Sequence, residues 1–208
     1  ALGLTPKSVL VCSTGVIGHL MPMDKIEAGI PKLVEKLHAD ASEEFGRAIL
    51  TTDLALKSHA VEIQTEKGVI TIGGACKGSG MIHPNMATML AFITTDISLP
   101  IDFFAEFRAD IADSFNAITV DGDTSTNDTC ILLANGMSGL RYEDLSLSEQ
   151  GEFRAALMLI MQSLAKDIVR DGEGATKLIE LRIEKAESHE EALRMARFIG
   201  TSNLAKCA

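Results

Sequence analysis

The 208-residue sequence lacks tryptophan and contains only 4% aromatic residues, so its hydrophobic core must be built mainly from aliphatic side chains. Hydrophobic residues still make up 46% of the chain, which is enough for a sizeable core, and the length suits one domain. No run of about 18 apolar residues occurs, so we expect no membrane-spanning helix. The net charge of −10 argues against a nucleic-acid partner, which would require a basic patch.

The sequence also lacks the residue spacings that metals and nucleotides require. No Cys-x-x-Cys pair occurs among the four cysteines, at positions 12, 76, 130 and 207. This spacing predicts reduced, mostly buried thiols in an intracellular protein, in preference to a disulfide framework or a zinc site. The histidines form no pair at ligand spacing, and neither a complete dinucleotide fingerprint nor a phosphate-binding loop is present. We therefore expect no metal and no cofactor.

Hydrophobic periodicity predicts a mixture of strands and helices, which is typical of an α+β layered domain. The strands are predicted at 8–13, 60–64, 69–75, 89–94 and 178–183, with a hairpin turn at 66–68. The helices are predicted at 23–29, 31–37, 41–50, 101–116 and 193–204. A further long helix should begin with a capping box of Ser146 and Glu149. One face of that helix carries regularly spaced apolar side chains, namely Phe153, Leu157, Ile160, Leu164 and Ile168.

The most informative stretch is Lys77-Gly-Ser-Gly-Met-Ile-His-Pro-Asn-Met-Ala-Thr-Met-Leu90. Small residues and a proline keep it out of regular helix, and they bring Thr88 to the beginning of a strand. The Thr88 hydroxyl could then attack the Ala87 carbonyl and shift the acyl group from nitrogen to oxygen. Water would open the ester and leave Thr88 with a free α-amine that can act as base for its own hydroxyl. Composition alone favours a plainer interpretation, a glycine-rich hairpin with an ordinary strand threonine.

The whole string closely resembles the self-cleaving segment of the ornithine acetyltransferase family, the glutamate N-acetyltransferases of arginine biosynthesis. The resemblance extends over essentially the whole chain through four more motifs: Ser13-Thr-Gly-Val-Ile-Gly18, Ile49-Leu-Thr-Thr-Asp53, Val120-Asp-Gly-Asp-Thr-Ser-Thr-Asn-Asp128 and Asp171-Gly-Glu-Gly-Ala-Thr-Lys177. It implies a layered sandwich of mixed β-sheets flanked by helices. It also implies self-cleavage between Ala87 and Thr88, which divides the chain into an alpha part (1–87) and a beta part (88–208).

The resemblance implies acetyl transfer from N2-acetylornithine to glutamate by a ping-pong mechanism through an acetyl-Thr88 intermediate. It assigns oxyanion stabilisation to Thr14 and Gly15, and substrate binding to Thr88 and to three further residues, Thr51, Lys77 and Glu173. The opposite charges of Lys77 and Glu173 suit a substrate that carries both a carboxylate and an ammonium. No cofactor is implied, and the use of acetyl-CoA as a second acetyl donor stays open.

The resemblance leads to further expectations about the whole protein. Because family members continue beyond both ends of this chain, we expect residues 1–208 to be a single catalytic region inside a longer protein. The two parts should stay associated and form a homo-oligomer of heterodimers in the cytoplasm, without nucleic-acid or membrane partners. Organellar targeting stays open because the chain begins without methionine, and the choice of Thr51 over Thr52 stays open as well.

Two other function classes compete with this assignment. The segment 121–128 imitates the beginning of a calcium loop, but Thr126 and Leu132 occupy the positions that require glycine and a bidentate glutamate. The apolar residues before Asp121 also imitate the haloacid-dehalogenase phosphotransfer strand, in which Asp121 would be the nucleophile, Asp123 the acid/base and magnesium the cofactor. The plainer interpretation is a hydrogen-bonded polar turn. The third class is a non-catalytic binding fragment, whose missing portions carry part of the pocket.

Overall fold

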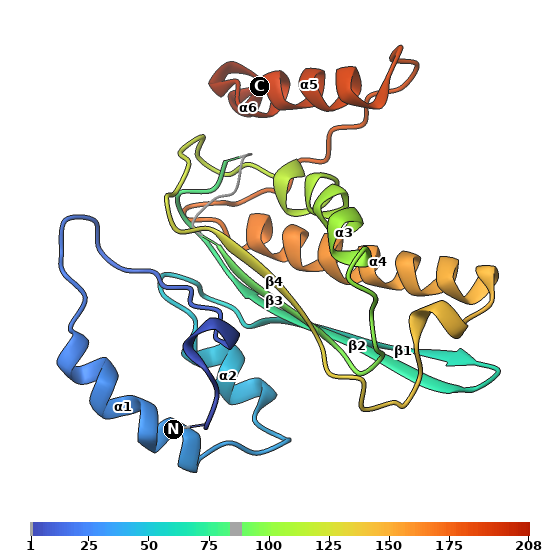
Figure 1. Cartoon of the computed structure of the whole chain (residues 1–208). Coiled ribbons are helices and arrows are strands. Elements are labelled where there is room, and N and C mark those ends of the chain that lie inside the picture. Colours follow the sequence, from blue (N-terminus) through green and yellow to red (C-terminus); the bar gives the residue numbers. More distant parts are fainter. Residues whose placement is uncertain (1, 84–88) are drawn as a thin grey trace.

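The computed structural model describes residues 2–83 and 89–208, and within them a four-stranded sheet carries helices on both faces (Figure 1). The strands β1 (Lys57–Thr65), β2 (Gly68–Lys77), β3 (Leu90–Thr95) and β4 (Thr129–Ala134) lie side by side in that order. The β1–β2 and β2–β3 pairs are antiparallel, whereas β3 and β4 are parallel. A parallel pair needs a long crossover, which residues 96–128 supply. The predicted α+β class is confirmed.

The predicted hairpin is confirmed as β1 and β2, which pair from Lys57 opposite Cys76 to Thr65 opposite Gly68. The turn is tied by its own side chain, because Thr65 Oγ1 accepts hydrogen bonds from the amides of Lys67 at 3.2 Å and Gly68 at 3.1 Å. This local bonding fixes the turn. It therefore also fixes the register that places each β1 side chain opposite its β2 partner.

The long helix α4 (Leu147–Arg170) covers the β1–β2 side of one face of the sheet (Figure 1). The predicted capping box is confirmed: Glu149 N donates to Ser146 Oγ at 3.3 Å, and Ser146 N donates to Glu149 Oε2 at 2.8 Å. The apolar face predicted from the sequence is buried, and the complete set of buried residues is Phe153, Leu157, Ile160, Met161, Leu164, Ala165 and Ile168. Burial of this face against the sheet forms the main core.

The core is mostly aliphatic, as expected, but three aromatic residues form a cluster within it. Phe103, Tyr142 and Phe153 contact one another edge to face, with ring centroids 5.0–5.8 Å apart. Phe103 begins α3 (Phe103–Ala112), and Tyr142 begins the short 3-10 helix η3 (Tyr142–Asp144). This aromatic cluster therefore packs the crossover and the loop after β4 against the N-terminal half of α4.

The opposite face of the sheet is only partly covered. α2 (Ser42–Ala48) packs on it through Phe45, whose ring meets that of Phe92 on β3 edge to face at 5.1 Å. Farther along this face, Leu133 on β4 remains 49% exposed. The N-terminal segment, with the 3-10 helix η1 (Pro6–Ser8) and α1 (Met23–Glu35), lies beside this face, and α1 has no buried residue (Figure 1).

Several predicted elements differ from the structure. The strands predicted at 8–13 and 178–183 do not form, and no partner strand lies beside either segment among the described residues. One sheet, not the two of a sandwich, is present in this described part. The two helices predicted at 23–29 and 31–37 are one helix, α1, with Pro31 inside it. Because α1 has no buried residue, water can replace the backbone hydrogen bond that Pro31 removes.

Two other predicted helices form, but each is divided into two elements. The predicted helix at 101–116 forms as α3 and the 3-10 helix η2 (Phe115–Ala117), and the last predicted helix forms as α5 (His189–Gly200) and α6 (Asn203–Cys207). All four cysteines are free, but the prediction of mostly buried thiols is wrong, because only Cys76 is fully buried and Cys207 is exposed. Burial raises the pKa of the half-buried Cys130 to about 12. Among the described residues, no helix is both long and apolar enough to cross a membrane.

The contact between β2 and α4 predicts a strong size limit at Gly74. A Cβ atom at Gly74 would lie 2.8 Å from Leu164 Cδ1 and 3.0 Å from Ile160 Cγ2, so Gly74→Ala forces these tightly packed side chains of α4 to shift. We expect it to lower the free energy of unfolding by about 1–3 kcal/mol, the usual range for overpacking. Urea unfolding measures this change. The control is Gly73→Ala, whose Cβ would meet only Thr94 Oγ1 at 3.4 Å, and equal losses would contradict the packing argument.

Candidate active site

The C-terminal end of β2 brings together residues from distant parts of the chain. Lys77 is the last residue of β2, and it is only 1% exposed. Its Nζ donates a hydrogen bond of 3.2 Å to Thr14 Oγ1, which lies 63 positions earlier in the sequence. Burial lowers the pKa of Lys77, and the carboxylates of Asp53 and Asp128 act in the opposite direction. Two of the predicted site residues thus meet directly.

The loop that carries Thr14 and Gly15 is held by a second family motif. Asn127 Nδ2 donates to the backbone oxygen of Ser13 at 3.1 Å, so the segments 13–15 and 120–128 lie next to each other. Thr14 is half-buried beside Lys77, whereas Gly15 is exposed. A threonine hydroxyl followed by a glycine amide offers two donors to one anionic oxygen, which is the composition of an oxyanion hole.

Asp128 is a site residue that the sequence reasoning missed. Its Oδ1 accepts a hydrogen bond of 2.9 Å from Met89 N, and its Oδ2 is buried without a hydrogen-bond partner in the part of the chain that the structure describes. Burial raises the pKa of this carboxyl to about 6, although the Met89 amide and the Lys77 charge act against the rise. Asp128 therefore holds the residue that follows Thr88 in the sequence. The predicted cleavage at Ala87–Thr88 itself lies outside the described residues. In the sequence, Asp128 is the last residue of the motif at 120–128, and nothing in its spacing distinguishes it from the other acids there.

An ionic cluster of Asp53, Lys57 and Asp171, called here the Lys57 cluster, lies beside Lys77. Lys57 Nζ is 2.6 Å from Asp53 Oδ1 and 2.5 Å from Asp171 Oδ2. These bonds raise the pKa of Lys57 despite its burial, and they lower the pKa of Asp53 despite the burial of that carboxyl. Sequence reasoning did not single out Lys57 or Asp53 as functional, because Asp171, which completes the cluster, is distant in the sequence.

The other two predicted substrate residues lie next to this cluster. Thr51 N donates to Asp53 Oδ2 at 3.1 Å, and Glu173 N donates to the backbone oxygen of Ser79 at 2.9 Å. The Glu173 side chain rests against Gly80, where an added Cβ would lie 2.8 Å from the carboxylate carbon. Glu173 is exposed, so its charge is free to meet a ligand from solvent.

The structure does not favour the phosphotransfer alternative. Asp121 Oδ2 accepts a hydrogen bond from Met81 N at 2.6 Å, and Oδ1 accepts from Ile82 N and Asp123 N at 3.0 Å each. Although the Asp121 side chain is exposed, both of its oxygens are therefore engaged by backbone amides, two of them in the loop after β2. The hydrogen-bonded polar turn is the correct interpretation of this segment. Within residues 2–83 and 89–208, no three potential metal-ligating side chains cluster together.

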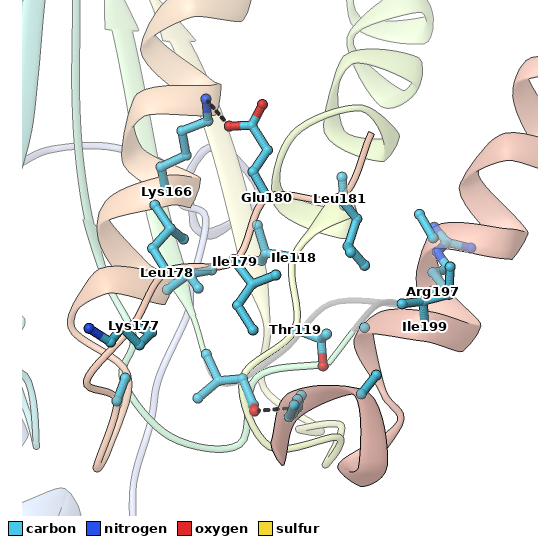
Figure 2. Close-up of a pocket in the computed structure, with 18 of the residues that line it drawn as sticks. Ile118, Thr119, Lys166, Lys177, Leu178, Ile179, Glu180, Leu181, Arg197 and Ile199 are labelled. Atoms are coloured by element: carbon cyan, nitrogen blue, oxygen red, sulfur yellow. Dashed lines mark hydrogen bonds and ion pairs between the residues drawn. The ribbon is translucent and has the colours of Figure 1, made fainter. Parts of the chain in front are cut away.

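A groove of about 590 Å³ lies elsewhere, between α4, residues 117–120 and 173–181, and the C-terminal helices (Figure 2). Its rim carries an ion pair of 3.4 Å between Lys166 and Glu180. Of the predicted site residues that the structure describes, only Glu173 lines it. The groove is therefore not the place where Thr14 and Lys77 meet.

A buried lysine in contact with a hydroxyl, near a carboxylate of raised pKa, is typical of an enzyme site for a small charged molecule. The chain belongs to the ArgJ family, whose model matches residues 1–208. The resemblance seen in the sequence motifs is therefore confirmed.

Individual relatives agree with this assignment. The chain is 49% identical over 207 residues to the arginine biosynthesis bifunctional protein ArgJ of Geobacillus kaustophilus, covering 99% of this chain and 50% of that protein. For ArgJ of Bacillus subtilis the identity is 48% over 212 residues, with 100% and 51% covered. The crystal structure of ArgJ from Bacillus halodurans is similar with a TM-score of 0.51 and 40% identity over 55% of each chain. The chain spans about half the length of the curated relatives it matches.

The buried carboxyl of Asp128 predicts a pH-dependent stability difference. Its pKa rises from 3.8 to about 6 on folding, so ionisation opposes folding increasingly as the pH rises from about 4 to about 6. Asp128→Asn should therefore stabilise the full-length protein at pH 8, by about 1 kcal/mol after allowance for partial exposure, and less at pH 4.5. Urea unfolding at both pH values measures the difference.

The matched control for this prediction is Asp123→Asn, which removes an exposed carboxylate from the same segment. A stabilisation by Asp128→Asn that is equal at pH 4.5 and pH 8 would contradict the assigned pKa. So would the same pH-dependent gain in the Asp123→Asn control.

Proposed function

We propose that the full-length protein transfers an acetyl group from N2-acetylornithine to glutamate through an acetyl ester on Thr88. The observation that carries the proposal is the contact between Lys77 and Thr14 at the end of β2. It joins two motifs of the family at the strand end that leads to Thr88. Membership of the ArgJ family and relatives named as arginine biosynthesis bifunctional proteins support the same reaction.

The first step is self-cleavage between Ala87 and Thr88, which frees the α-amine of Thr88. A free α-amine has a pKa of about 7.7–8.0, so a useful neutral fraction exists near pH 7. This amine takes the proton of the Thr88 hydroxyl as the oxygen attacks the acetyl carbonyl of acetylornithine. The proton then passes to the departing ornithine nitrogen. Glutamate's amine next attacks the ester, which gives N-acetylglutamate and restores the hydroxyl.

The hydrogen bond from Lys77 supports the assigned role of Thr14. A lysine ammonium can only donate, so the Thr14 oxygen accepts from Lys77 and its own proton remains free to be donated elsewhere. That proton, with the Gly15 amide, would stabilise the negative oxygen of the tetrahedral intermediate. The ammonium also polarises the hydroxyl, which makes Thr14 a stronger donor.

Charge supports a zwitterionic substrate. Lys77 offers a cation at the end of β2, and Glu173 offers an exposed carboxylate beside Gly80. These two side chains would meet the carboxylate and the ammonium of ornithine, with Thr51 as a further contact. The chemistry needs no cofactor. The relatives are named bifunctional, which indicates a second activity. Acetyl-CoA is the second acetyl donor that we would test.

The sheet supports continued association of the two pieces after cleavage. Residues 72–77 of β2 pair with residues 90–95 of β3, and the proposed cut lies between these strands. Their backbone hydrogen bonds and shared core would hold the pieces together as a heterodimer. We propose that such heterodimers assemble into a homo-oligomer in the cytoplasm, which native mass spectrometry can test.

The reaction predicts a specific covalent adduct. The full-length protein, incubated with acetylornithine and without glutamate and then quenched in acid, should yield two pieces by denaturing mass spectrometry. The piece that begins at Thr88 should carry one extra acetyl group, because acylation precedes acceptor binding in a ping-pong mechanism. Added glutamate should remove the acetyl group as N-acetylglutamate.

The variant Thr88→Ala should remain one uncut and unacetylated chain. The matched control Thr94→Ala, which changes an exposed threonine on β3, should be cut and acetylated normally. Cleavage of the Thr88→Ala chain at the same bond would mean that an external protease cuts it. A wild-type protein without an adduct would refute the acetyl-Thr88 mechanism and leave a non-catalytic binding function.

The role of Thr14 predicts a loss of rate without a loss of binding. Thr14→Ala removes the hydroxyl donor to the oxyanion, and loss of one such donor lowers kcat by about 10²–10³-fold. Thr14→Ser keeps the hydroxyl and should retain most of the rate. Steady-state kinetics of cleaved enzyme measures both variants, and an unchanged kcat in Thr14→Ala would remove the hydroxyl from the mechanism.

A further inference from the structure

The Lys57 cluster is almost completely withdrawn from water. The side chains of Lys57 and Asp53 are 1% and 0% exposed, and that of Asp171 is 9% exposed. Burial of three charges is costly, and such clusters often contribute little to stability compared with apolar residues of the same size. Stability alone is therefore a weak explanation for this cluster.

Both carboxylates of the cluster also hold backbone amides. Asp53 accepts hydrogen bonds from Gly78 N at 2.7 Å and from Thr51 N at 3.1 Å. Asp171 Oδ2 accepts from Leu54 N at 2.9 Å and from Ala55 N at 3.3 Å. Each carboxylate thus fixes a loop while it neutralises Lys57.

The loops fixed in this way are those that carry the proposed substrate-binding residues. Thr51 is bonded to the cluster directly, Lys77 precedes the bonded Gly78, and Glu173 follows Asp171 by two positions. The backbone oxygen of Asp171 also accepts from Ser79 Oγ at 2.7 Å. Three segments that are distant in the sequence therefore share one ionic centre.

The charge of the cluster also bears on Lys77. Two carboxylates and one ammonium leave a net charge of −1, and Lys77 is the neighbouring buried cation. The Asp53 carboxylate counteracts the fall in the Lys77 pKa that burial causes, and its effect exceeds that of the Lys57 ammonium, which lowers the Lys77 pKa. The cluster therefore favours the charged form of the side chain that would bind the substrate carboxylate.

We propose that the Lys57 cluster is a positioning site that holds the three substrate-binding segments in one fixed arrangement. The inference rests on the proposed acetyl transfer and deepens it. Lys57, Asp53 and Asp171 do not touch the reacting atoms in this proposal. They fix the distance between the cation of Lys77 and the anion of Glu173, and so determine which zwitterion fits.

The test compares full-length Lys57→Met with wild type, because methionine keeps much of the apolar stem and removes the ammonium. Two substrates are used, acetylornithine and N-acetylputrescine, which lacks the carboxylate. Per cleaved enzyme, we expect kcat/KM for acetylornithine to fall about 10²-fold, mostly through a higher KM, because misplacement of binding groups by about 1 Å has effects of that size. The value for N-acetylputrescine should change much less, so discrimination between the substrates is lost.

Three further variants complete the design. Lys57→Arg should recover part of the discrimination, because a cation returns between the two carboxylates. Asp171→Asn removes one negative charge and keeps the shape of the side chain. It is measured in the same way and replaces Lys57→Met if that variant does not fold. Lys166→Met breaks the exposed ion pair with Glu180 and should behave as wild type.

The outcomes separate the inference from the proposed function. A wild-type enzyme that neither cleaves nor transfers acetyl groups refutes the function itself. A different result would be an active wild type and a Lys57→Met variant in which a smaller fraction of the protein is cleaved and active. In that result, the KM for acetylornithine and the discrimination between the two substrates would be unchanged. The cluster would then be structural, and the positioning role would be wrong.

Discussion

The need to pair buried charge organises the end of β2. The Lys57 ammonium lies between the carboxylates of Asp53 and Asp171, and each of these groups is nearly inaccessible to water. An unpaired charge in this place would be prohibitively costly, so the two segments that supply the charges, residues 53–57 and Asp171, must come together for the chain to fold. The same carboxylates hold backbone amides of residues 51, 54, 55 and 78, so pairing the charges also shapes the loops of the candidate site.

The sheet and its main helix determine whether these charges can meet. Lys57 begins β1, opposite Cys76 on β2, and the hairpin register places it beside the strand end that carries Gly78. Asp171 follows the last residue of α4, so its position depends on how that helix lies on the sheet. Gly74 permits the close approach of α4, because any side chain there would strike Leu164 and Ile160. A one-residue slip of the hairpin would turn Lys57 to the other face and break the cluster.

Local patterns in the sequence predicted the elements that depend on local physics. The apolar face of α4, its Ser146–Glu149 capping box and the β1–β2 turn are set by neighbours within a few positions, and all three are confirmed. The strand predicted at 178–183 failed because alternation of apolar residues supplies no partner strand.

Family motifs indicated Thr14 and Lys77, which the structure brings into contact. Lys57 and Asp128 were missed because burial and distant partners, not residue spacing, give them their properties. The polar turn, the plainer interpretation of the segment around Asp121, agrees with the structure, in which that carboxylate accepts hydrogen bonds from the amides of Met81 and Ile82.

The position of the proposed cut has a consequence for the whole site. Thr14, Lys77 and the Asp53–Lys57 pair would belong to the first piece, whereas Asp128, Asp171 and Glu173 would belong to the second. The short ionic contact of 2.5 Å between Lys57 and Asp171 therefore crosses from one piece to the other, and so does the β2–β3 pairing. Separation of the pieces would expose the core and leave Lys57 with one carboxylate instead of two. The proposed cleavage would thus create a new amine at Thr88 and leave the site assembled, because charge pairing and strand pairing would both hold the two pieces together.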